Sequence, residues 1–154
     1  MLVKEIMSIN YITLAPETSF FEAAKMLLEN RASGAPVIDQ SGNLVGLVSE
    51  KDLFRALYPS YHYFYLNPES FLNHDEDLKE ATIEAKQKKV IDIMSKRPII
   101  ATPETNILKI GGLMVASGIH HVPVVENGKV IGMISRGNIY RAILQDEFDL
   151  HQTK

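Results

Sequence analysis

The feature that most constrains the fold of this chain is that its sequence contains one pattern twice. Residues 3–39 align with 90–126, and 41–57 align with 127–143, with 15 identities among 54 aligned positions. Many identities are prolines, glycines and serines, which set turns and close backbone approaches. One copy of about 55 residues buries little apolar surface by itself. We therefore expect an internal duplication whose two halves pack on each other.

The sequence of each copy predicts, in this order, a short helical lead-in, a brief extended segment, a helix, a two-stranded hairpin and a closing helix. In the first long helix of each copy apolar residues recur at spacings of three and four, after the N-cap pairs Thr18-Ser19 and Thr105-Asn106. Gly118 is a predicted helix end, and Asn127-Gly128 is a hairpin signal. The fold class is therefore α/β in the α+β sense, built from two β-α-β-β-α units. The predicted ranges are 3–7, 11–13, a helix from 20, 35–39, 44–49 and 50–57, then 90–94, 99–101, a helix from 107, 122–126, 129–135 and 136–145.

This pattern divides the chain into a first repeat (1–57), a connecting segment (58–89), a second repeat (90–145) and a polar tail (146–154). The connecting segment holds six of the twelve aromatic residues, so we expect it to pack on the module or on a partner subunit. The side chains of its acidic run, His74 to Asp77, are of types that can bind a metal ion. Such a run is more typical of a solvent-exposed surface, and we expect that here. The aromatic residues are Tyr58, Tyr61, Tyr63, Phe64, Tyr65 and Phe71.

Charge and composition exclude several classes of function. Sixteen basic residues face 19 acidic ones and no basic cluster occurs, which excludes a nucleic-acid binder. The absence of cysteine excludes disulfides and thiolate sites and is compatible with a reducing cytoplasm, where we expect the protein to reside. No signal peptide or membrane-spanning segment is evident. His120 and His121 are neighbours on a predicted strand and point to opposite faces, so we expect no metal site there.

The repeated corner between the last strand and the closing helix is the main candidate for binding. Gly46 to Asp52 reads as an apolar strand, a hydroxyl and then a carboxylate three residues later, and Gly132 to Asn138 repeats it with an amide. A helix begins at each corner, where unpaired N–H groups favour anions and polyols. Ser49 can donate and Asp52 can accept, which suits the vicinal diol of a ribose. The alternative is that both residues only cap a helix.

Together these motifs resemble a tandem pair of cystathionine-β-synthase (CBS) domains. The resemblance rests on the lead-ins ending in Met, the Pro-Val strands and the two Gly-x-x-Ser-x-x-Asp/Asn corners in register. It implies a sensor without catalytic activity, which joins with a second copy as a homodimer and binds AMP, ADP, ATP or S-adenosylmethionine as a regulatory ligand. No other cofactor is implied, and the regulated partner is not identified by the sequence.

The resemblance also implies two clefts, each taking its corner from one copy and its lining from the other. In the cleft with the full family pattern, Asp52 would hold the ribose, and His120 or His121 a phosphate. In the other cleft Asn138 replaces the acid, which predicts weaker or different binding. The first cleft would comprise Leu47, Ser49, Lys51, Asp52, Arg97, Ile99, Ile119, His120 and His121. The second would comprise Met133, Ser135, Arg136, Asn138, Ile12, Thr13, Ala32 and Ser33.

A second hypothesis is a scaffold that binds no ligand and serves only for dimerisation or for docking a partner through residues 58–71. The chain has no P-loop and no triad order that this fold would bring together, so the sequence predicts no enzyme.

Overall fold

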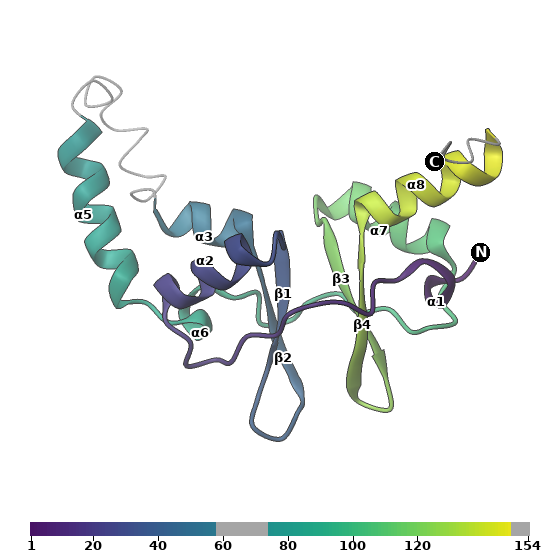
Figure 1. Ribbon diagram of the computed structural model, residues 1–154, viewed down its shortest axis with the longest axis horizontal. Coiled ribbons are helices and arrows are strands. Elements are labelled where there is room, and N and C mark those ends of the chain that lie inside the picture. The colour runs from purple at the N-terminus through teal and green to yellow at the C-terminus, as the bar shows by residue number, and fades with distance from the viewer. Residues whose placement is uncertain (58–73, 149–154) are drawn as a thin grey trace. The chain divides into compact units, whose positions relative to one another are not determined.

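The computed structural model describes residues 1–57 and 74–148 and divides the chain into two compact units (Figure 1). Unit 1 comprises Met1–Tyr11, Gly42–Leu44 and the chain from Arg97 onward, and unit 2 comprises Ile12–Ser41 and Val45–Lys96. The aromatic segment 58–71 and the end of the polar tail lie outside the described residues, so their predicted packing stays a prediction. No helix in the described ranges has the length and apolarity that crossing a bilayer requires.

Unit 2 contains the body of the first repeat, with helices packed against a hairpin of two strands. The core is formed by side chains from α2, β1, β2, α3 and α5 together with Val90 of α6, whose side chain is fully buried. Leu14 extends the hairpin with a parallel bridge to Val37, and Ser95 extends it with an antiparallel bridge to Leu47. The elements are α2 (Phe20–Glu29), β1 (Gly34–Ile38), β2 (Leu44–Ser49), α3 (Glu50–Ala56), α5 (His74–Gln87) and α6 (Val90–Ile93).

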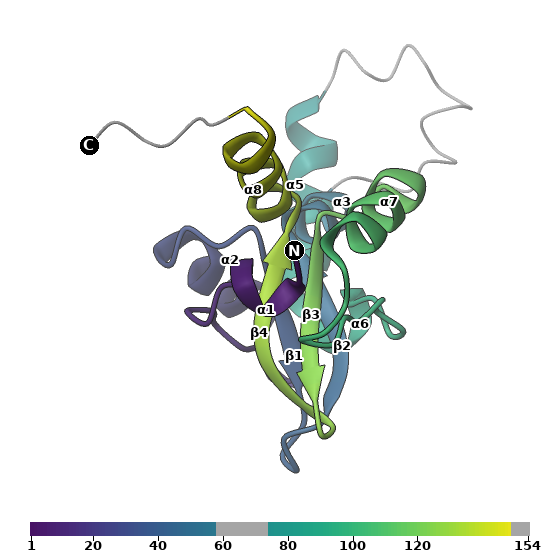
Figure 2. The ribbon, with the colours of Figure 1, turned by 90° about the vertical axis from the view of Figure 1, so that its right-hand side faces the viewer.

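Unit 1 repeats this architecture with the body of the second repeat (Figure 2). Strands β3 and β4 are antiparallel with His121 opposite Ser135, and a bulge interrupts their register after Val124. Ala101 adds a parallel bridge to Val124, and Ser8 an antiparallel one to Met133. The elements are α1 (Val3–Ile6), α7 (Ile107–Ser117), β3 (His121–Glu126), β4 (Lys129–Ser135) and α8 (Arg136–Glu147).

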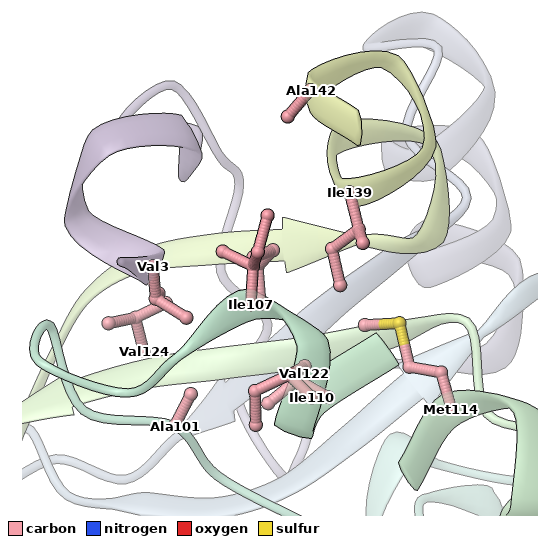
Figure 3. Packing of buried hydrophobic residues seen from close by; sticks show 10 residues of the cluster. Val3, Ala101, Ile107, Ile110, Met114, Val122, Val124, Ile139 and Ala142 are labelled. Carbon is pink, nitrogen blue, oxygen red and sulfur yellow. The ribbon is translucent and has the colours of Figure 1, made fainter. Parts of the chain in front are cut away.

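The two lead-in helices are exchanged between the repeats. Helix α1 opens the first repeat, yet its Val3 is fully buried in unit 1, among side chains of α7, β3, β4 and α8 (Figure 3). Helix α6 opens the second repeat, and its Val90 occupies the corresponding place in unit 2. The repeat pattern alone does not reveal this exchange, because both lead-ins offer the same valine to either core.

Local chemistry explains most element boundaries. The side chain of Ser19 accepts a hydrogen bond from the N–H of Glu22, and that of Asn106 accepts one from Leu108, so both predicted N-caps are confirmed. Gly118 ends α7 in the left-handed conformation. The predicted extended segments 11–13 and 99–101 are not strands; each of these regions contributes only a single-residue bridge, at Leu14 and at Ala101.

Candidate ligand-binding corners

The first corner joins β2 to α3 and is held by a carboxylate. The backbone N–H of Ser49 and the hydroxyl Oγ of Ser49 both donate to Asp52 Oδ2, each at 2.8 Å. Both residues are half-buried. No described residue donates to Asp52 Oδ1, so one carboxylate oxygen remains able to accept a hydrogen bond from a ligand.

The second corner joins β4 to α8 and has the same geometry with the opposite polarity. Ser135 donates to Asn138 Oδ1 from its backbone N–H at 2.9 Å and from its hydroxyl at 2.6 Å, and the N–H of Asn138 donates to Ser135 Oγ at 3.2 Å. The backbone donor fixes Oδ1 in this position, since an amide nitrogen could not accept the bond. Within the described ranges no residue accepts from Asn138 Nδ2. This corner therefore presents N–H donors where the first presents an acceptor.

Each corner also lies beside a loop of its own unit. The N–H of Glu50 donates to the carbonyl of Ser33 at 3.0 Å, and the N–H of Arg136 donates to that of His120 at 3.0 Å. Ala32–Ser33 therefore adjoin the Asp52 corner, and His120–His121 adjoin the Asn138 corner. The sequence assigned these loops to the opposite clefts, and it did not show that each also adjoins the corner of its own unit.

The surroundings of His121 in unit 1 lower its pKa. Partial burial disfavours its charged form, and the nearby His120 and Arg136 add to this, so its pKa lies below the ordinary histidine value. Its ring is therefore held neutral at pH 7.

The structure places the remaining predicted site residues within the two units. Leu47, Ile12, Ala32, Ile99 and Ile119 are half-buried, whereas Met133 is buried. The exposed members are Thr13, Ser33, Lys51, Arg97, His120 and Arg136. In the part of the chain that the structure describes, no cluster of histidine and carboxylate side chains could hold a metal ion.

Sequence reasoning missed two residues, Ser8 and Ser95, that pair with the strands leading into the corners. Ser95 and Leu47 exchange both backbone hydrogen bonds, two residues before Ser49, and Ser8 and Met133 do the same two residues before Ser135. The repeated Ile-Met-Ser and Gly-x-x-Ser motifs were visible in the sequence, but nothing in the sequence showed that each pairs with the other repeat.

The chain is thus built from two units of one topology, each with a serine corner closed by a carboxylate or by an amide. A family model described as CBS domain matches residues 3–59 and 90–145. The chain therefore belongs to the CBS domain family and contains a tandem pair of these domains.

Known proteins resemble the chain over most of its length. It is 30% identical over 155 residues to the uncharacterized protein MJ1426 of Methanocaldococcus jannaschii, covering 94% of this chain and 92% of that protein. It also resembles the crystal structure of Arabidopsis thaliana CBSX2 in complex with AMP, with 30% identity, a TM-score of 0.71 and coverage of 95% and 98%. The chain spans 60% of the full CBSX2 sequence.

A second related structure contains other adenosine derivatives. The CBS domain pair of protein MJ0100 was crystallised with 5′-methylthioadenosine and S-adenosylmethionine. It is 25% identical to this chain, with a TM-score of 0.72 and coverage of 95% of this chain and 98% of that one.

Proposed function

We propose that this chain is a regulatory module that binds an adenosine-containing small molecule, such as AMP, ADP, ATP or S-adenosylmethionine, and transmits its presence to a partner protein. The observation that carries the proposal is the Ser49–Asp52 corner, where a half-buried carboxylate keeps Oδ1 for an incoming donor. The related structures with AMP and with 5′-methylthioadenosine support it, since each of these ligands has a ribose with two neighbouring hydroxyls.

In this proposal Asp52 accepts hydrogen bonds from the ribose hydroxyls, while Lys51, the residue before it, serves the phosphate side of a nucleotide. A hydrogen bond to an ionised carboxylate contributes about 1.5–3 kcal/mol, which makes Asp52 the main anchor. The ligand acts as an effector and undergoes no reaction. The chain has no cysteine nucleophile and no phosphate-binding Gly-x-x-x-x-Gly-Lys loop, which supports binding rather than catalysis.

We also propose a homodimer, because the two units expose apolar residues at corresponding helix positions. On α2, Phe21 and Leu28 are 63% and 76% exposed, and on α7, Leu108 and Val115 are 66% and 81% exposed. A Cβ built on Gly112, also on α7, would meet nothing within 4 Å, so a second helix can approach closely there. Replacement of Leu28 and Val115 by lysine should give a monomer by sedimentation velocity, and an unchanged sedimentation coefficient would contradict the proposal.

A ligand panel on protein freed of bound nucleotide tests the main proposal. A ligand present at about a hundred times its Kd stabilises the fold by about 2.7 kcal/mol. We expect a rise in Tm with at least one of AMP, ADP, ATP, S-adenosylmethionine and 5′-methylthioadenosine, and a loss of that rise in the Asp52→Ala variant. A Tm that is unchanged by all five compounds would favour the alternative hypothesis of a scaffold that binds no ligand.

A further inference from the structure

The lead-in of each repeat contacts the strand that leads into the corner of the other repeat. In unit 1, Ser8 N–H donates to the carbonyl of Met133 at 2.8 Å, and Met133 N–H donates back at 2.9 Å. In unit 2, Leu47 N–H donates to Ser95 at 3.0 Å, and Ser95 N–H donates back at 2.9 Å. Leu47 and Met133 each precede the corner serine by two residues, about 6.6 Å along a strand. These bonds therefore fix the strand next to the corner.

A glycine in each of these strands allows the contact. A Cβ built on Gly132 would lie 2.9 Å from Met7 Sδ and 3.0 Å from the carbonyl oxygen of Ser8. A Cβ built on Gly46 would collide with Met94 and would lie 2.9 Å from the carbonyl oxygen of Ser95. Because real Cβ contacts are almost never this short, only glycine leaves room for the methionine and the backbone behind it.

The lead-ins also hold the turn before the first long helix and contact the closing helix. The N–H groups of Val3 and Lys4 donate to Thr105 and Pro103, at 2.8 and 3.0 Å, and α1 contacts α8. In unit 2 the N–H groups of Val90 and Ile91 donate to Thr18 and Pro16, at 2.8 and 3.0 Å, and α6 contacts α3. Each lead-in thus contacts both elements that meet at a corner, the strand and the helix that follows it.

We propose that each lead-in is a positioning segment for the binding corner of the opposite repeat. Met7 and Ser8, at the start of the first repeat, position Ser135 and Asn138 of the second. Met94 and Ser95, at the start of the second repeat, position Ser49 and Asp52 of the first. As a consequence, displacement of residues 1–11 changes affinity at the Asn138 corner, and displacement of residues 88–96 changes it at the Asp52 corner. This inference rests on the proposed function only for the ligand readout.

The test uses two matched variants, Met7→Ala and Met94→Ala, with Met7→Leu and Met94→Leu as controls that keep most of the side-chain volume. The first readout is hydrogen exchange, which needs no ligand. Met94→Ala should speed exchange of the Ser49 amide, which is bonded to Asp52, by about tenfold and leave the Ser135 amide unchanged. Met7→Ala should do the reverse, and both leucine controls should restore slow exchange.

The second readout is AMP affinity, measured by calorimetry in backgrounds that remove one corner, Asp52→Ala or Asn138→Ala. Met94→Ala should weaken the Asp52 corner by about tenfold and spare the Asn138 corner, since small misplacements of contact groups are costly. An effect of Met94 on its own repeat's corner, or equal effects on both corners, would overturn the inference. Absence of binding of all five panel compounds to the unaltered protein would instead count against the proposed function, while the exchange measurement would still decide the positioning role.

Discussion

The Asp52 and Asn138 corners share one backbone geometry and differ in the hydrogen-bonding group that they leave for a ligand. In both, the oxygen of the third helical residue accepts two bonds from the preceding serine. The carboxylate then has a second oxygen, which accepts, whereas the amide has a nitrogen, which donates. The comparison teaches that a change of one residue type preserves the fold of the corner, because the capping oxygen is kept, and reverses what the corner can recognise.

Loss of the carboxylate should have the largest effect. Asp52→Ala removes the charged acceptor, and we expect AMP affinity at the first corner to fall by about a hundredfold, consistent with bonds to charged groups. Isothermal titration calorimetry measures this, with Asn138→Ala as the matched control. If the two variants lost affinity equally, the difference in polarity would have no bearing on binding.

Ribose analogues should separate the two corners next. In 2′-fluoro-2′-deoxy-AMP and its 3′ counterpart a hydroxyl that can donate is replaced by fluorine, which cannot. At the Asp52 corner we expect a loss of about tenfold in affinity with at least one analogue, since that corner only accepts. The Asn138 corner should discriminate less, because it donates. Titration of each single-corner variant with AMP and both analogues provides the measurement.

Conversion of the second corner into the first should have a smaller effect of the opposite sign. In Asn138→Asp, the capping bonds from Ser135 remain possible and an acceptor replaces the Nδ2 donors. We expect AMP affinity at this corner to rise by about fivefold, since charge-assisted bonds are about twice as strong as neutral ones. The reverse variant, Asp52→Asn, is the control and should lose affinity. A gain in both variants would contradict the assignment.

The smallest effect concerns pH and the loop beside the Asn138 corner. Because the pKa of His121 in the folded protein is lowered, the unfolded chain binds more protons once the pH falls below about 6.5. The contribution of His121 to the free energy of unfolding should therefore be level above that pH and decline below it. In His121→Gln part of this decline should disappear, and Ser33→Gln, at a loop of unit 2, serves as a control. Urea unfolding between pH 5 and 8 checks the difference.

The sequence predicted the order of elements well, because that order depends on local signals. Ser19, Asn106 and Gly118 cap helices through their own side chains or backbone. Such caps involve only residues close in sequence, so the local sequence was sufficient to predict these helix ends. The extended segments 11–13 and 99–101 lead to single-residue bridges, at Leu14 and at Ala101, and their apolar residues did not reveal how short this pairing is.

The candidate site was predictable in composition and less so in arrangement. The Ser-x-x-Asp and Ser-x-x-Asn spacing predicts the capping bonds, and both sets are present. The sequence could not show that Nδ2 of Asn138 is left to donate. That conclusion follows from the backbone N–H of Ser135, which contacts the amide oxygen of Asn138 in the folded protein. Ser8 and Met133, which pair, are 125 residues apart in sequence. Because both repeats contain the same motifs, the sequence pattern did not show whether each lead-in pairs with its own repeat or with the other one.

The exchanged lead-ins have a consequence for cutting the chain. Cleavage between residues 57 and 74 would give two fragments, and neither would contain a whole core, since each carries the valine that the other lacks. Such fragments should fold only when mixed, each completing the other. By the same reasoning, a molecule with one repeat could close its core only by trading N-terminal segments with a second molecule, so that fusion of two such genes would turn an intertwined pair into a single chain.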